Sequence, residues 1–170
     1  MRSKLLIMYK QHLLQNIERE IVLLKQLAPL IKESDLNFRP TEKVRSTYEL
    51  MQYLTYIGGV MMRRYVKNDV TPEVREELMA YRDTLTIDNF VERIDEQWNI
   101  IQKYMADVTE EQLLTMEVEL PWKEKMPLGQ AIITGPIKWL AAYRLQLFFY
   151  LKLNGRPEIG TKDAWVPEAS

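Results

Sequence analysis

Four long segments of this chain repeat apolar residues at steps of three and four, which is the period of one face of an α-helix. In residues 3–28 the repeat includes Tyr9, Leu13, Ile17 and Leu24, with charged residues between them. The same period recurs over residues 46–67, 86–105 and 127–151. Amphipathic helices bury their apolar faces best by packing on one another. The pattern therefore predicts an all-α protein built as a four-helix bundle.

Capping signals predict where some helices begin. Ser46 followed by Glu49 has the spacing of a capping box, in which each side chain satisfies a free backbone donor of the first turn. Thr109 followed by Gln112 repeats this spacing and predicts a single helical turn. A Thr-Pro pair predicts another short helix over residues 72–81. The bundle is therefore expected to carry short accessory helices.

Glycine and proline predict the irregular points. The glycine pair at 58–59 indicates a bend or a close helix approach, and Gly-Pro at 135–136 predicts a kink in the last helix. Residues 116–120 alternate apolar and acidic side chains, and we interpret them as part of a long connection before the last helix, not as evidence for a sheet. Asn154-Gly155 predicts the end of that helix, and from about residue 156 we expect a loose C-terminal tail.

Length and composition favour one domain over residues 1–170. The chain is 46% hydrophobic, which is enough for one sizeable core, and it contains no linker, internal repeat or low-complexity tract. Its 23 Lys and Arg are balanced by 24 Asp and Glu, so no strong net charge would attract nucleic acid. We therefore expect a helical domain that does not bind nucleic acid.

The absence of cysteine excludes disulfides, thiolate nucleophiles, Cys-based zinc sites and iron–sulfur clusters together. The longest uncharged apolar stretches fall well short of the roughly 20 residues that a membrane helix needs. The first apolar run ends at Lys10, too early for a signal peptide. We therefore expect a cytoplasmic protein without membrane contact.

Two segments resemble the DinB/YfiT-like superfamily. Residues 34–40 followed by 48–54 are similar to the connection and second helix of that family. Residues 139–146, in the helix that ends at Asn154-Gly155, resemble its His-x-x-x-His-Arg-Gly-Gln signature. Members of the family are four-helix bundles and are often dimeric. Many carry a divalent metal on three histidines, and some are thiol-dependent transferases or hydrolase-like enzymes.

The departures from this pattern concern the metal. Tyr53, Trp139 and Tyr143 stand where the resemblance places the three histidines, and His12 is the single histidine of the chain. An indole has no free lone pair for a metal, and a tyrosine with a reference pKa of about 10 is a poor ligand without histidine partners. We expect no metal and no other cofactor, with these three aromatic side chains filling the former site. Arg144 and Gln146 match the signature and are expected to flank that pocket.

Three functions follow as alternatives. The first is a bundle without metal that binds a small molecule or a protein partner. The second is a metal-independent transferase or hydrolase-like enzyme that uses the inter-helix pocket, with Tyr53 or Tyr143 as acid and Arg144 as an anion clamp. The third is a dimerisation scaffold, since a homodimer is expected from the supply of apolar residues. Because the metal chemistry is missing, we rank binding above catalysis and assign no catalytic residue.

Overall fold

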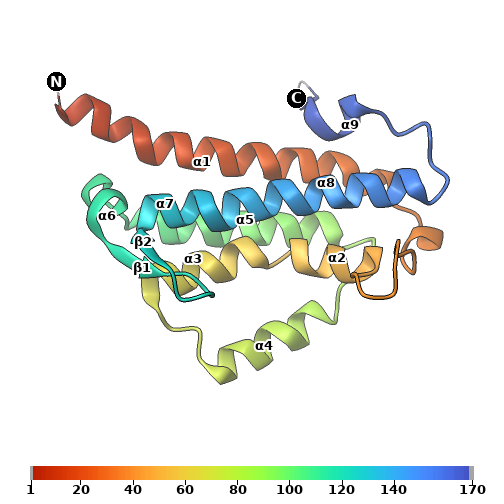
Figure 1. Cartoon of the computed structure of the whole chain (residues 1–170), viewed down its shortest axis with the longest axis horizontal. Helices are drawn as coiled ribbons and strands as arrows, with labels where there is room; N and C mark the ends of the chain where they lie inside the picture. Colours follow the sequence, from red (N-terminus) through yellow and green to blue (C-terminus); the bar gives the residue numbers. More distant parts are fainter. Residues whose placement is uncertain (1, 169–170) are drawn as a thin grey trace.

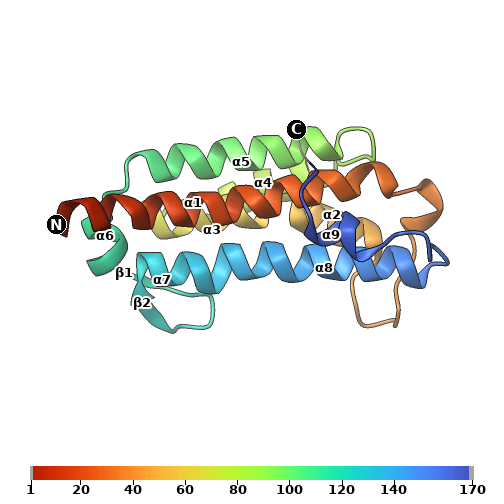
Figure 2. The same cartoon turned by 90° about the horizontal axis from the view of Figure 1, so that it is seen from above.

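Four long helical stretches lie side by side in the computed structural model, which describes residues 2–168 (Figures 1 and 2). They are α1 (Arg2–Leu27), the pair α2 (Thr47–Leu54) and α3 (Ile57–Lys67), α5 (Phe90–Ala106), and a last stretch formed by α7 (Leu128–Ile132), η3 (Ile133–Ile137) and α8 (Lys138–Leu153). Helix α1 contacts both α5 and α8, whereas α3 contacts α5 and α8 from the other side. The predicted all-α four-helix bundle is confirmed.

The core of the bundle consists of the apolar stripes that the sequence predicts. Each stretch contributes side chains that are less than 2% exposed. These include Ile17, Leu24, Leu50, Leu54, Ile94, Ile101, Leu140 and Leu147. Burial of an aliphatic side chain of this size contributes about 1.5–3 kcal/mol, so the shared core accounts for the arrangement.

The second helical stretch is broken between α2 and α3, and a glutamine from α5 fills the break. The side chain of Gln97 donates to the Leu54 carbonyl at 2.8 Å and accepts from the Gly58 amide at 2.7 Å. In a continuous helix these two backbone groups would bond each other, so the amide of Gln97 replaces one hydrogen bond of the helix. Gln97 is only 1% exposed. The close approach predicted at the glycine pair is therefore present, and it is made to α5.

The connection before the last helix contains a small hairpin. Strand β1 (Glu117–Glu119) pairs antiparallel with β2 (Lys125–Pro127), and Val118 lies opposite Met126. Both of these side chains are buried against the bundle. The interpretation of residues 116–120 as a connection that gives no evidence for a sheet is therefore wrong, because the segment contains a paired strand. The alternation of apolar and acidic residues was the sequence signal for this strand, because successive side chains of a strand point to opposite faces. The apolar face is buried, and the acidic side chains pair with Lys123 and Lys125.

The last helical stretch is continuous through the predicted kink. The segment η3 is a turn of π-helix that contains Pro136. Proline has no amide hydrogen to donate, so the chain adopts the wider turn at this point. Helix α8 then continues to Leu153, as the sequence predicts.

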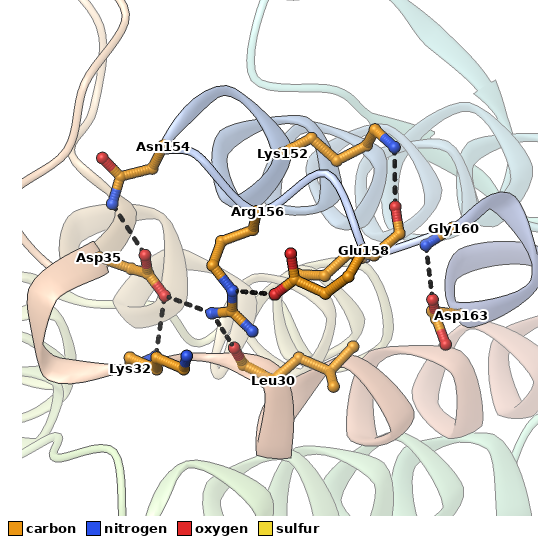
Figure 3. A network of polar contacts seen from close by, with 10 residues as sticks. Leu30, Lys32, Asp35, Lys152, Asn154, Arg156, Glu158, Gly160 and Asp163 are labelled. Carbon is orange, nitrogen blue, oxygen red and sulfur yellow. Dashed lines mark hydrogen bonds and ion pairs between the residues drawn. The ribbon is translucent and has the colours of Figure 1, made fainter.

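The segment after residue 156 is packed against the bundle, which corrects the expectation of a loose tail. Helix α9 (Thr161–Trp165) contacts α1 and α8, and Ile159 and Ala164 are buried. Asp35, in the 3-10 turn η2 (Glu33–Asp35), accepts from Arg156 and from Asn154 and so fixes the start of this segment (Figure 3). Buried polar contacts, and not a long apolar stripe, hold it in place.

Three further short helical elements complete the structure. The 3-10 turn η1 (Ala28–Leu30) follows α1, and α6 (Glu110–Thr115) precedes the hairpin. Helix α4 (Pro72–Arg82) begins at the predicted Thr71 cap and lies apart from the four long stretches (Figure 1). Among the described residues, none of the helices combines the length and the apolar character that crossing a membrane requires.

Candidate functional site

Two of the three predicted pocket residues contact each other. Tyr53 of α2 and Tyr143 of α8 are half-buried, and their ring centroids lie 4.8 Å apart in an edge-to-face arrangement. The guanidinium of Arg45 stands 4.3 Å from the Tyr53 ring centroid and 5.6 Å from that of Tyr143. Burial and the neighbouring Tyr143 raise the pKa of Tyr53, against the opposing effect of Arg45. The Tyr53 hydroxyl is therefore neutral at physiological pH.

Trp139 belongs to a different aromatic pair. Its ring is half-buried and packs against Trp122, in the turn of the hairpin, at 6.1 Å between centroids. The three aromatic side chains expected to fill one site therefore form two separate pairs, with Tyr143 and Trp139 one turn apart on the last helical stretch. Trp122 is 51% exposed, so this second pair lies near the surface.

Arg144 does not contact the tyrosine pair, and Gln146 is hydrogen-bonded within its own helix. The Arg144 side chain is 1% exposed, its Nε donates to Glu20 Oε2 of α1 at 2.7 Å, and its Nη1 donates to the Ala164 carbonyl of α9. Gln146 donates to the Tyr150 hydroxyl on the same helix. The prediction that Arg144 flanks the pocket is wrong in position, because consecutive residues of a helix face different directions. Its guanidinium anchors the C-terminal segment.

A separate cleft lies between α3, α4 and α5. It has a volume of about 650 Å³. Val74, Leu78 and Tyr81 of α4 line one wall at helical spacing. Helix α4 buries none of its residues fully, so this apolar stripe faces the cleft and not a packed core. The apolar residues of α4 at helical spacing were visible in the sequence. Their spacing alone does not distinguish a helix that faces an open cleft from one that packs against the core.

The opposite wall of the cleft includes the α2–α3 break. Thr55, Tyr56 and Gly59 line it, together with Gln97 and Ile100 of α5. A Cβ atom at Gly59 would lie 3.2 Å from Ile100 Cγ2, so the glycine permits α3 and α5 to approach here. Burial raises the pKa of Tyr56, against the opposing effects of Arg82 and Arg45. Its hydroxyl is therefore a neutral hydrogen-bonding group near the cleft.

Charged side chains hold the two ends of helix α4. At one end, Arg63 Nε and Nη2 donate to the carboxylate of Asp69 at 2.8 and 3.2 Å. At the other end, the Arg93 guanidinium lies 3.5 Å from the Tyr81 ring centroid, and its Nη2 donates to Thr84 Oγ1 at 2.6 Å. These contacts tie both ends of α4 to the bundle while the middle stays open.

Searches with protein-family models and against curated proteins found no match to this sequence. A solved structure from Exiguobacterium sibiricum, described as a candidate member of the DinB family, is similar with a TM-score of 0.66. The similarity covers 86% of this chain and 92% of that chain at 22% sequence identity. The chain has the DinB-like fold. The fold implied by the sequence resemblance is thereby confirmed.

The positions where the sequence resemblance places three histidines carry side chains that do not fit a metal. Tyr53 is held protonated by burial, Trp139 offers no lone pair and faces Trp122, and Arg45 already places a positive charge over Tyr53 and Tyr143. Among the side chains that the structure describes, residues 9–168, no three from His, Cys, Asp or Glu come together as a metal-binding group.

Proposed function

We propose that this chain binds a small organic molecule in the cleft between α3, α4 and α5, and that it acts as a binding protein without a metal. One observation carries the proposal. The apolar stripe of α4 faces a volume of about 650 Å³, within the range of roughly 300–1,000 Å³ that is usual for small-molecule sites. A helix that leaves such a stripe unpacked gains stability when a ligand covers it.

Catalysis by the tyrosine pair has weaker support. The enzyme alternative needs Tyr53 or Tyr143 as an acid and Arg144 to hold an anionic substrate. A raised pKa makes Tyr53 a weaker acid than free tyrosine, and Arg144 is committed to Glu20 and Ala164. We therefore place a transferase or hydrolase-like activity second to binding.

The binding proposal is tested with Nile red, a neutral apolar dye whose fluorescence rises in an apolar site. We expect saturable enhancement with the unmodified chain and its loss in Leu78→Trp, because the larger indole projects into the cleft and obstructs the apolar wall of α4. Ala80→Trp is the matched control, since Ala80 is exposed on the same helix and does not line the cleft. Equal dye binding by both variants would place the dye elsewhere and remove the support for this site.

A homodimer is a second proposal, and a different surface supports it. Ala142, Leu145, Phe149 and Leu153 form one apolar face of α8, on which Phe149 is 49% and Leu153 is 63% exposed. An exposed apolar stripe of this kind suits a two-fold contact between helices. Light scattering should give about twice the monomer mass of 20.2 kDa, and Phe149→Glu should return the monomer. A monomer mass for the unmodified chain at micromolar concentration would refute the dimer.

A function without metal also has a direct measurement. We expect elemental analysis of the dialysed protein to give far less than one nickel, zinc or iron per chain. One metal per chain that also raises the melting temperature would contradict this part of the proposal.

A further inference from the structure

The charges around the cleft identify what kind of molecule it takes, provided that the cleft is the binding site proposed above. Three cationic side chains line it: Arg63, Arg93 and Lys103. Each can attract an anionic ligand only to the extent that its charge is not already neutralised by the protein. The partners of these groups therefore decide whether a charged ligand is favoured.

Arg63 and Arg93 both have carboxylates beside them. Arg63 makes two hydrogen bonds to Asp69, which lies just outside the cleft, and these bonds raise the pKa of the guanidinium. Arg93 Nη1 lies 3.6 Å from Glu96 Oε2, and the guanidinium also stacks on Tyr81. Neither arginine presents an isolated positive charge to the cleft.

The other two charges have opposite signs. Lys103 of α5 and Glu77 of α4 are exposed side chains of the lining. The three cations are thus matched by three carboxylates, namely Glu77 and Glu96 in the lining and Asp69 beside it. The cleft has no net charge to offset that of an ionic ligand.

The remaining surface is mainly apolar and aromatic. Val60, Val74, Leu78 and Ile100 supply aliphatic area, and three tyrosines supply rings with hydroxyl groups: Tyr56, Tyr81 and Tyr104. Moving an ion from water to such a surface costs free energy unless a counter-charge receives it. A neutral molecule avoids this cost and still gains the apolar contact.

We propose that the ligand is an uncharged, largely apolar organic molecule whose polar groups hydrogen-bond to the tyrosines and to the lining amides. The selectivity against ions comes from the internal pairing of the cleft's own charges, and Arg93 and Glu96 are the ion pair whose two members both line the cleft.

Three probes with one carbon skeleton test this selectivity: 4-phenylbutan-1-ol, 4-phenylbutylamine and 4-phenylbutyrate. Each is titrated into the full chain at neutral pH, with bound Nile red as the reporter of displacement. We expect the alcohol to bind at least about tenfold more tightly than either ion, because only the ions lose hydration without a counter-charge. The affinity of the alcohol should also be insensitive to salt.

Two variants that each remove one member of the Arg93–Glu96 pair should change which ionic probe the cleft prefers. Glu96→Gln leaves Arg93 uncompensated and should raise the affinity for 4-phenylbutyrate about tenfold, whereas Arg93→Gln leaves Glu96 uncompensated and should raise that for 4-phenylbutylamine. Glu92→Gln is the matched control, because Glu92 is exposed on the same helix and does not line the cleft. Retention of Nile red binding in each variant shows that the cleft is intact.

The outcomes separate the two proposals. If Nile red binds in the cleft but an ionic probe matches or exceeds the alcohol, the neutral-ligand inference is overturned while the binding function stands. Failure of the alcohol to displace Nile red, or unchanged preferences in both Arg93 and Glu96 variants, also overturns the inference. If Nile red itself does not bind in a manner sensitive to Leu78→Trp, the binding function fails and the inference fails with it.

Discussion

Helices α4 and α9 both lie at the edge of the bundle, and they are attached to it in opposite ways. Helix α4 has 11 residues and buries none of them fully, whereas α9 has only five and buries Ala164 completely. Length and amphipathic character therefore do not decide how firmly a peripheral helix is held. The buried polar groups that the bundle presents to it decide this.

Helix α9 is held by side chains that satisfy its free carbonyl groups. Arg144 donates to the Ala164 carbonyl, and Gln26 of α1 donates to the carbonyls of Asp163 and Val166 at 3.2 and 3.1 Å. A helix this short leaves most of its carbonyls without partners inside the helix. The side-chain donors therefore supply the hydrogen bonds that further helical turns would otherwise provide. The C-terminal segment is consequently packed onto the bundle as part of the fold.

The polar contacts that hold helix α4 in the described structure lie at its ends. Arg63 binds Asp69 before it, and beyond its centre Gln52 donates to the Arg82 carbonyl while Arg93 stacks on Tyr81. Its central stripe faces the cleft. The bundle thus holds α9 closely at one edge and leaves an open cleft beside α4 at the other, which is the arrangement expected of a binding site.

The largest effect is expected at Arg144. Replacing it with Met leaves the Glu20 carboxylate, which is 14% exposed, without its cation and removes the donor to α9. Loss of one partner of a buried ion pair costs about 3–5 kcal/mol, and we expect this decrease in the free energy of unfolding, measured in urea.

Arg19→Met is the control for this substitution. Arg19 also donates to α9, at the Trp165 carbonyl, but it is exposed on α1. Its loss should cost less than about 1 kcal/mol. Similar costs for the two variants would mean that burial of Arg144 does not govern the attachment of α9.

A smaller effect is expected at Asp35, which is 1% exposed. Its carboxylate accepts from the Lys32 amide, from Asn154 and from Arg156 at 2.9, 2.8 and 3.3 Å (Figure 3). Asp35→Asn keeps the shape but places an amide donor among these donors. We expect a cost of about 2 kcal/mol in urea unfolding, because hydrogen bonds to charged groups contribute about 1.5–3 kcal/mol.

The exposed partner of Arg156 provides the comparison for Asp35. The Glu158 side chain is 59% exposed, so Glu158→Gln should change stability by less than about 0.5 kcal/mol. A cost at Glu158 equal to that at Asp35 would show that burial of the network does not matter.

Signals within a few residues gave the correct local structure. The capping box at Ser46 and Glu49 forms in both directions, with bonds of 3.2 and 2.6 Å. The cap at Thr109 and Gln112 likewise forms in both directions. These interactions depend on three-residue spacing, so the sequence contains everything needed to predict them.

Long-range pairs could not be predicted in the same way. Arg144 and Glu20 are 124 residues apart, and nothing near Arg144 in the sequence indicates that it faces α1 and not the tyrosine pair. The contact between Tyr53 and Tyr143 was anticipated only because the family resemblance pairs those helices. The cleft escaped prediction because it depends on how far α4 stands from α3 and α5, a distance that no single helix encodes.

A small effect on stability is expected for Leu78 of α4, which lines the cleft, and this substitution tests whether α4 stands away from the bundle. Leu78 is half-buried and faces the cleft, whereas Leu54 in α2 is fully buried in the core. Leu54→Ala should cost about 3 kcal/mol, because it removes packed apolar area and leaves a cavity. Leu78→Ala should cost less than about 1 kcal/mol, because the volume beside it is already open. If urea unfolding gives similar costs for both, α4 packs against the bundle in solution, and the site proposed for a neutral ligand is closed.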